Sequence, residues 1–353
     1  MNLMEVNRKK ILITVSLLII ALAPLFLSDF RLNLLAKFLT FCIVAIALDF
    51  IWGFGGMLSL GHGIFFGLGA YSMAMYLKLE ASGEKLPDFM VWSGLLELPF
   101  FWKPFQNFFF VLTSSLILPA IVAGLIGYMV FRSRIKGVYF SILTQAMAMI
   151  AAILLVGQQP YTGGTNGITN FSTILGFSLS NKNTQLFLYL ITAICLVLSF
   201  LISQRLINSR FGKVLIAIRD MEDRVRFCGY DPVKYKTFAF AFSATLTGLA
   251  GALFVTQVGI ISPAMIGIVP SIEMVIWVAV GGRSNLYGAC AGALLVNVAK
   301  TYLSESFPDL WLYFQGLLFI VVVLFVPGGI VGLIKKLFKE SKKEQNILLS
   351  EEK

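Results

Sequence analysis

The sequence predicts an all-α polytopic membrane protein with about 10 transmembrane helices and with both termini in the cytoplasm. Hydrophobic residues make up 58% of the 353 positions and charged residues only 13%, whereas soluble domains are roughly 45–50% apolar and about 25% charged. Apolar runs recur along the whole chain with no polar segment long enough to form a soluble domain. Lysine and arginine concentrate in alternate connecting segments, a pattern that orients membrane helices.

Ten apolar segments are candidates for transmembrane helices, which need about 20 mostly apolar residues each to cross a bilayer, although the eighth is short. The expected spans are residues 11–28, 32–51, 60–78, 108–131, 138–156, 184–204, 237–258, 268–281, 286–304 and 311–334. The first resembles a secretory signal sequence that ends at Ala21-Leu22-Ala23. Pro24 follows that site and the apolar run continues, so we interpret the segment as a retained helix. The glycine-rich stretch Gly53 to Gly63 makes the start of the third span the weakest.

The distribution of lysine and arginine predicts which segments face the cytoplasm. With the N-terminus inside, the inside segments hold Arg8 to Lys10, Arg132 to Lys136, 205–236, Arg283 and Lys335 to Lys343. The outside segments hold only Arg31, Lys85, Lys103 and Lys182. We therefore expect the net charge of +10 to mark the cytoplasmic face, and we expect no nucleic-acid binding.

One transmembrane domain is expected over residues 1–340, followed by a charged cytoplasmic tail at 341–353. The segments 80–107 and 157–183 are expected on the extracytoplasmic side. The segment 205–236 is expected in the cytoplasm, between the sixth and seventh spans, and 12 of its 32 residues are charged. We call residues 205–236 the charged segment.

The charged segment is predicted to contain a short amphipathic helix pair. Four residues suggest an apolar face: Leu215, Ile218, Val225 and Cys228. Gly229-Tyr230-Asp231-Pro232 is expected to end the helix. Acidic residues alternate with basic ones, which suits contact with another protein better than contact with lipid. A solvated connecting loop is the alternative interpretation.

Motifs for catalysis, metal binding and nucleotide binding are absent from the sequence. His62 is the only histidine, the four cysteines are scattered, and no HExxH, GxSxG or GxxxxGK[ST] motif occurs. We therefore expect a non-catalytic membrane subunit that binds no metal and no cofactor and does not itself hydrolyse ATP. A transporter, a channel or a structural subunit remains.

Several stretches resemble known transport proteins. Asp223, followed by Gly229 and by Asp231 to Lys236, resembles the cytoplasmic coupling loop of ABC-importer permeases. Three further stretches resemble the permease family of branched-chain amino-acid ABC importers: "GMLSLGHGIFFGLGAY" (Gly56 to Tyr71), "SIEMVIWVAVGG" (Ser271 to Gly282) and "PGGIVGL" (Pro327 to Leu333). The resemblance covers about residues 40–335 in the same order.

Within that family, the stretches at 46–54, 86–102 and 297–333 look closer to the urea branch, in which this chain would be the second permease. The resemblance implies a second homologous permease, two cytoplasmic ATPases that use ATP, an extracytoplasmic solute-binding protein, and a place in the bacterial cytoplasmic membrane. The chain departs from the family pattern at three places: Arg224-Val225 where small residues are usual, "GGRSN" at 281–285, and Gly328.

The implied mechanism assigns a coupling role to part of the charged segment. Closure of the ATPase dimer would pull on the docked helix and switch the permease pair between outward and inward access. The expected ATPase-coupling residues are Arg219, Glu222, Asp223, Arg224 and Gly229.

Polar residues in or next to apolar spans are candidates for the solute pathway, because charges in lipid are costly. The candidates are Asp49, Gly53, Gly55, Gly56, His62 and Glu273. The glycines are interpreted as a helix break that forms a pathway wall, or else as close helix packing. The alternatives for the charged residues are internal pairs: Glu273 with Lys300, and Asp49 with amides freed near Gly53 to Gly63.

Three functions follow from these observations. The first is a urea importer permease, and the second is a branched-chain amino-acid importer permease, whose zwitterionic solute needs both of its charges matched. The third is a channel or a proton-coupled carrier for a small polar solute. The charged segment argues against the third, because a channel needs no docking helix.

Overall fold

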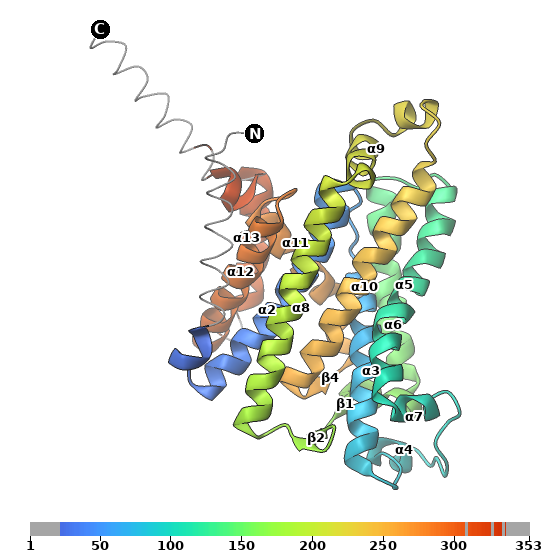
Figure 1. Ribbon diagram of the computed structural model, residues 1–353, viewed down its shortest axis with the longest axis vertical. Helices are drawn as coiled ribbons and strands as arrows, with labels where there is room; N and C mark the ends of the chain where they lie inside the picture. Colours follow the sequence, from blue (N-terminus) through green and yellow to red (C-terminus); the bar gives the residue numbers. More distant parts are fainter. Residues whose placement is uncertain (1–21, 308–309, 326–327, 334–335, 337–353) are drawn as a thin grey trace, which may run out of the picture.

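The computed structural model describes residues 22–307, 310–325, 328–333 and 336. It is built mainly of long helices (Figure 1). These are α2 (Asp29–Asp49), α3 (His62–Ser82), α5 (Phe108–Arg132), α6 (Val138–Gly157), α8 (Lys182–Asn208), α9 (Arg210–Phe227), α10 (Pro232–Val258), α11 (Ile268–Gly281), α12 (Leu286–Ser306) and α13 (Trp311–Phe325).

Short elements connect the long helices. They are α4 (Asp88–Trp92), α7 (Gln159–Thr162), the π-helix η1 (Phe50–Phe54), the 3-10 helices η2 (Lys103–Gln106), η3 (Gly164–Asn166) and η4 (Pro263–Met265), and the strands β1 (Ile168–Thr169), β2 (Thr173–Ile174), β3 (Phe177–Ser178) and β4 (Ile260–Ile261). Strand β1 pairs antiparallel with β4, and β2 pairs antiparallel with β3.

Seven segments of the described residues are helical, long and apolar enough to cross a membrane. They are Asp29–Phe54, Phe108–Arg132, Val138–Gly157, Lys182–Asn208, Pro232–Val258, Pro263–Gly281 and Leu286–Ser306. The expected third span folds as α3, which has the length of a span but does not reach the apolarity of these seven. The expected tenth span begins with α13, whose apolar stretch is shorter, and most of the first lies outside the described residues. The count of ten spans and the cytoplasmic termini stay predictions.

The core is formed around α2, α3 and α10. Helix α10 packs against α5, α3 and α2, while α2 also packs against α8 and α12. About three quarters of the most apolar stretches of α2 and α10 are buried, at 78% and 72%, but only 22% of those of α5 and α6. Helices α5 and α6 therefore leave broad apolar faces for lipid or for a neighbouring subunit.

Glycine brings the backbones of the core helices into contact. A Cβ atom at Gly69 of α3 would overlap the backbone of Gly248 in α10. Gly288 and Gly292 of α12 likewise face the backbone of α11 near Gly281. For Gly288 and Gly292 the structure shows the close packing that small residues permit between membrane helices.

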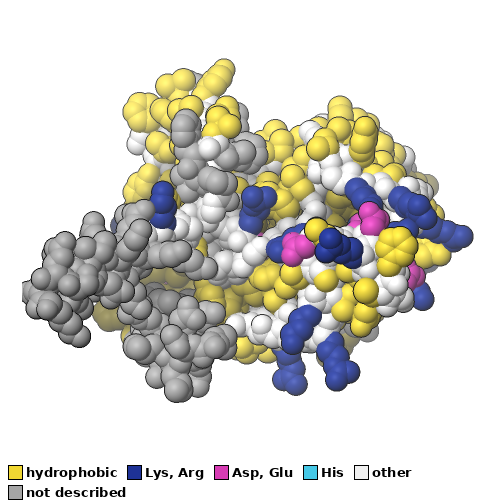
Figure 2. Space-filling model, turned by 90° about the horizontal axis from the view of Figure 1, so that it is seen from above, with side chains coloured by type: hydrophobic (Ala, Val, Ile, Leu, Met, Phe, Trp, Pro, Cys, Tyr) yellow, Lys and Arg dark blue, Asp and Glu magenta, His cyan; other side chains and the backbone are white. Residues whose placement is uncertain are grey.

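The two ends of the molecule differ in composition. The elements α4, α7 and β2, from the two segments expected outside, lie at one end, and α9 lies at the other (Figure 1). Viewed onto the α9 end, lysine and arginine side chains are spread over the surface with few acidic groups (Figure 2). We call this the basic end. It corresponds to the face that the sequence predicts to be cytoplasmic.

Candidate functional site

Helix α9 forms the middle of the charged segment and consists of two pieces. The Ser209 hydroxyl caps its start by accepting a hydrogen bond from the Gly212 amide. Met221 has non-helical dihedral angles, with φ −151° and ψ 77°, and marks a kink between the pieces. The helix ends at Phe227, Gly229 follows with φ +85°, and Asp231 caps the start of α10. The predicted helix pair and its stop signal therefore match the structure.

The predicted apolar face of α9 is right at three positions and wrong at one. Leu215, Ile218 and Val225 are buried against the helix bundle. Cys228 is exposed, because the chain leaves the helix at that residue and turns toward α10.

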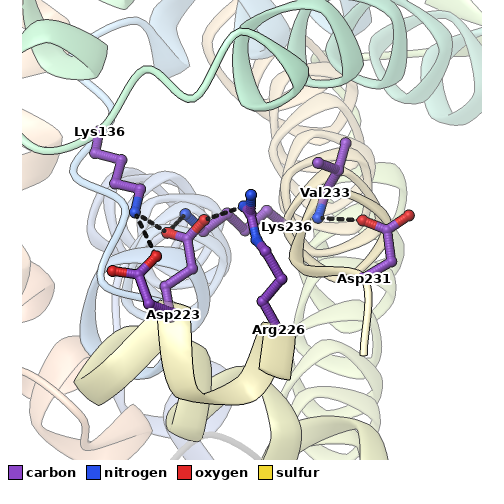
Figure 3. Close-up of polar contacts among 7 residues, drawn as sticks. Lys136, Asp223, Arg226, Asp231, Val233 and Lys236 are labelled. Carbon is purple, nitrogen blue, oxygen red and sulfur yellow. Dashed lines mark hydrogen bonds and ion pairs between the residues drawn. The ribbon is translucent and has the colours of Figure 1, made fainter. Parts of the chain in front are cut away.

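Glu222 ties the second piece of α9 to two neighbouring elements. Its carboxylate lies 2.5 Å from the Lys236 ammonium in α10 and 3.3 Å from the Lys136 ammonium in the α5–α6 turn. Arg226 lies 3.3 Å away on α9 itself. Figure 3 shows Lys136, Arg226 and Lys236 converging on this point. Sequence reasoning missed both lysines as partners of Glu222, because Lys136 is distant in the chain and Lys236, 14 residues away, lies on another helix.

The surroundings of Glu222 favour its charged form. Burial alone would raise the pKa of its carboxyl group, since desolvation penalises the anion. The hydrogen bonds and charges of Lys236 and Lys136 outweigh burial and hold the pKa below its ordinary value. Glu222 is therefore a fixed anion that holds α9 in place.

Arg219 ties the first piece of α9 to another part of the bundle. Its guanidinium donates to the Gly53 carbonyl in η1 at 2.7 Å and to the Ser284 hydroxyl in the α11–α12 turn at 3.2 Å. The Ser284 hydroxyl donates to the same Gly53 carbonyl at 2.7 Å. The Arg219 side chain passes directly over Gly56, where a Cβ atom would overlap it.

Asp49 holds the α11–α12 turn against the end of α2. The carboxylate is fully buried and accepts from the Ser284 amide at 2.8 Å and the Asn285 amide at 2.9 Å. Asn285 in turn caps α12 by accepting from the Tyr287 amide. The sequence offered pairing of Asp49 with backbone amides as an alternative, and the structure shows such pairing. The amides come from the α11–α12 turn and not from the glycine-rich stretch.

The helix break predicted at Gly53 to Gly56 falls within that stretch. Gly53 itself lies inside η1, which continues α2 as a π-helix to Phe54, and Gly55 is its C-cap. A side chain at Gly53 would collide with Asp49 and Ser284. The role of Gly53, Gly55 and Gly56 as a pathway wall stays a prediction.

His62 is fully buried at the start of α3, with both ring nitrogens bonded. Nε2 lies 2.8 Å from the Ser243 hydroxyl and Nδ1 lies 3.0 Å from the Ser59 hydroxyl. Ser243 donates its own proton to the Ala47 carbonyl, so Nε2 must carry the proton that Ser243 accepts. Through these bonds the ring joins α3 to α10 and α2.

Glu273 forms the internal pair that the sequence offered as an alternative. The Lys300 ammonium in α12 donates to both of its carboxylate oxygens, at 2.8 and 2.9 Å. This pair lies on α11 and α12, apart from the contacts around Arg219.

The remaining coupling candidates lie on the outer surface of α9. Asp223, Arg224 and Gly229 are exposed at the basic end. Phe227 stands beside them with 92% of its surface exposed. Sequence reasoning missed Phe227, although a large apolar residue in a charged segment is a usable signal for a contact surface.

A cavity of about 570 Å³ opens between α9, η1 and the α5–α6 turn. Its wall includes Gly56, Lys136, Arg219, Glu222 and Lys236. Residues from both sets of contacts that hold α9 therefore line one cavity. Among the described residues, no group of three or more His, Cys, Asp or Glu side chains could hold a metal ion.

Known proteins similar to this chain are permeases of branched-chain amino acid transport systems. The chain is 26% identical to the high-affinity branched-chain amino acid transport system permease protein LivM of Escherichia coli, over 94% of this chain and 77% of that protein. It is 24% identical to the permease protein BraD of Pseudomonas aeruginosa, over 83% of this chain and 92% of that protein. No solved structure matches the chain.

The chain also matches a protein family over most of its length. The family is described as "Branched-chain amino acid transport system / permease component", and the match runs over residues 30–323. These residues include nearly all of the helices from α2 to α13. The chain therefore belongs to the branched-chain amino acid transport permease family.

Proposed function

We propose that the chain is the permease subunit of an ATP-driven importer in a bacterial cytoplasmic membrane. It forms the solute pathway with a second permease, receives solute from an extracytoplasmic binding protein and is driven by two cytoplasmic ATPases. The observation that carries this proposal is that α9, at the basic end, is bonded to two separate parts of the bundle.

Those two attachments suggest how movement is transmitted. Arg219 fixes the first piece of α9 to η1 and the α11–α12 turn, and Glu222 fixes the second piece to α10 and the α5–α6 turn. The kink at Met221 lies between them. A force on α9 therefore acts on both parts at once and changes the cavity between them, which a two-state access mechanism requires.

The outer surface of α9 supplies the contact with an ATPase. Phe227, Met221 and Tyr230 expose apolar surface among the charges of Asp223 and Arg224. An aromatic anchor within a charged rim is the composition of an interface hot spot. In this mechanism the chain itself performs no chemistry and holds no cofactor, because ATP is hydrolysed by the partner subunits.

The solute proposed first is a branched-chain amino acid, in line with the family and with the relatives LivM and BraD. Urea is the second candidate and rests on the resemblance of residues 46–54, 86–102 and 297–333 to the urea branch. The comparisons add no support for urea. The docking surface of α9 disfavours the third candidate, a channel or proton-coupled carrier.

Docking is tested by replacing the aromatic anchor. Phe227→Asp removes the apolar contact, and we expect the purified permease to lose its ATPase subunits and ATP-driven uptake. Phe177→Asp is the matched control, because Phe177 is an exposed phenylalanine in β3 at the opposite end. It should retain the ATPases. Retention by Phe227→Asp, or equal loss in the control, would refute docking through α9.

The solute is tested in vesicles that hold the complete importer. Uptake of labelled leucine that requires ATP and resists excess urea supports the first candidate. Uptake of labelled urea that resists excess leucine supports the second. Uptake of either solute without ATP would overturn the importer proposal.

A further inference from the structure

Three charged side chains from three helices form a cluster away from α9. Lys300 of α12 donates to both carboxylate oxygens of Glu273 in α11. Lys37 of α2 lies within electrostatic reach of both groups. No ion pair or hydrogen bond of the Lys37 ammonium is found among the described residues, where it lies 5.8 Å from the ring centre of Phe41. With both lysines charged, the cluster holds one positive charge more than its carboxylate balances.

The cluster lies inside the membrane region near the end opposite α9. Lys37 is eight residues from the start of α2, which corresponds to about 12 Å at a rise of about 1.5 Å per residue. Lys300 is six residues from the end of α12, or about 9 Å by the same measure. Asp29 at the start of α2 pairs with Lys182 at the start of α8, at the end that carries β2.

An unbalanced charge at this depth requires a counter-charge or access to water. A charged side chain in a membrane span is costly, so such residues face protein partners or water-filled cavities. Lys300 keeps 35% of its side-chain surface exposed, and Lys37 is only partly buried. The cluster is therefore open on one side and not sealed as a structural pair would be.

Helix α13 contributes an aromatic ring and a hydrogen-bond acceptor that has no donor among the described residues. The Lys300 ammonium lies 4.4 Å from the ring centre of Trp311. Gln315 follows one turn later on the same helix face. Its Oε1 atom is buried and has no hydrogen-bond partner among the described residues. Buried acceptors in native proteins normally have a donor, so this carbonyl can accept an N–H from a group outside the described residues.

We propose that Lys37, Glu273, Lys300 and Gln315 form a solute-binding subsite on the outer half of the pathway. Its ligand carries N–H donors next to an anionic or carbonyl oxygen. In an amino acid the carboxylate is bound by Lys37 and the ammonium by Glu273 and Gln315. Urea also carries N–H donors and a carbonyl oxygen, but neither group is charged. This inference rests on the proposed importer function for its class of solute.

The test uses the complete importer in vesicles, with two readouts. The first is uptake of labelled leucine or urea, and the second is stimulation of ATP hydrolysis by the loaded binding protein. Lys37→Met should reduce leucine uptake at least about tenfold, since it removes a charge-assisted hydrogen bond to the solute carboxylate. Stimulated hydrolysis should persist, because docking and α9 are unchanged. Lys182→Met, which removes an exposed lysine at the same end, should transport normally.

Exchanging the two charges distinguishes an ion pair that recognises the solute from one that only stabilises the fold. The double variant Glu273→Lys with Lys300→Glu keeps an ion pair but moves the charges, so the subsite predicts that uptake stays low. Glu273→Gln, which keeps the shape of the side chain, should also lower uptake of either solute while the complex remains assembled by size-exclusion chromatography. If urea is the solute, Lys37→Met should have a smaller effect than Glu273→Gln.

Two outcomes would overturn the subsite. Wild-type uptake in the swapped variant would show that the pair is structural, and wild-type uptake in both Lys37→Met and Glu273→Gln would show that the cluster does not contact solute. In either case the unmodified importer still couples ATP to uptake. Loss of ATP-dependence in the unmodified importer would instead contradict the proposed function.

Discussion

Glu222 and Asp223 are adjacent in the sequence but occupy different environments. The Glu222 side chain keeps 12% of its surface exposed and meets three cations, whereas Asp223 is 82% exposed and lies 3.7 Å from Lys136 alone. Sequence reasoning gave both the same coupling role. The structure separates a carboxylate that holds α9 in place from one that is available to a partner.

Glu222→Ala should destabilise the protein much more than Asp223→Ala. Removing Glu222 leaves Lys236, which is only 10% exposed, without its counter-ion. Breaking such a pair costs about 3 kcal/mol or more, while exposed pairs contribute only about 0–1 kcal/mol. The midpoints of thermal unfolding in detergent should therefore fall for Glu222→Ala alone. Equal midpoints would show that the Glu222 contacts do not stabilise the fold.

The lowered pKa of Glu222 also predicts a dependence on pH. A carboxyl group whose folded pKa lies below its unfolded value, about 4.3, stabilises the protein fully above that value. The stabilisation is lost as pH falls through the lower, folded pKa. The difference in unfolding midpoint between the unmodified chain and Glu222→Gln should be largest near neutral pH and shrink in acid. A difference that grows in acid would contradict this assignment.

Single residues were predictable where their chemistry is unusual for a membrane. The sequence singles out Asp49, His62, Glu273 and Lys300 because each is polar in an apolar stretch, and all four make specific contacts. The Glu273–Lys300 pair was one of the alternatives that the sequence offered, but the partners of Asp49 and His62 were harder to predict. Asp49 meets an amide 235 residues away, and nothing local in the sequence marks that contact.

At the scale of elements, α9 was the most predictable. Its charge density, its apolar spacing and the Gly-Tyr-Asp-Pro stop are local features, and they gave its limits and most of its buried face. The error at Cys228 arises at the helix end, where periodicity no longer applies. The sequence predicted a pair of short helices, which implies a break between them, but it did not place that break at Met221.

The end of α2 was less predictable. Glycine at positions 53, 55 and 56 predicted a break, since glycine disfavours helices. The chain continues through Gly53 to Phe54 as a π-helix, where contacts with Ser284 and Arg219 satisfy the Gly53 carbonyl, and the break follows at Gly55. Tertiary contacts therefore override the local preference at this position.

For the whole molecule, composition and charge distribution predicted the class of fold, and apolar runs located most of the long helices. The expected span 268–281 coincides with α11. Helix α3 was the least certain, because a helix enclosed by protein does not need an apolar surface facing lipid. Which helices pack at the centre was not predictable, since it depends on contacts between distant segments.

The central claim is that α9 transmits the action of ATPases to the bundle through Arg219 and Glu222. The most direct test measures solute molecules taken up per ATP hydrolysed by the complete importer in vesicles. Arg219→Met should keep its ATPases and hydrolyse ATP but lower this ratio about tenfold, because charge-assisted hydrogen bonds to Gly53 and Ser284 are lost. Arg210→Met, which removes an exposed arginine at the start of α9, should keep the normal ratio. An unchanged ratio in Arg219→Met, or an equal fall in both variants, would contradict transmission through this contact.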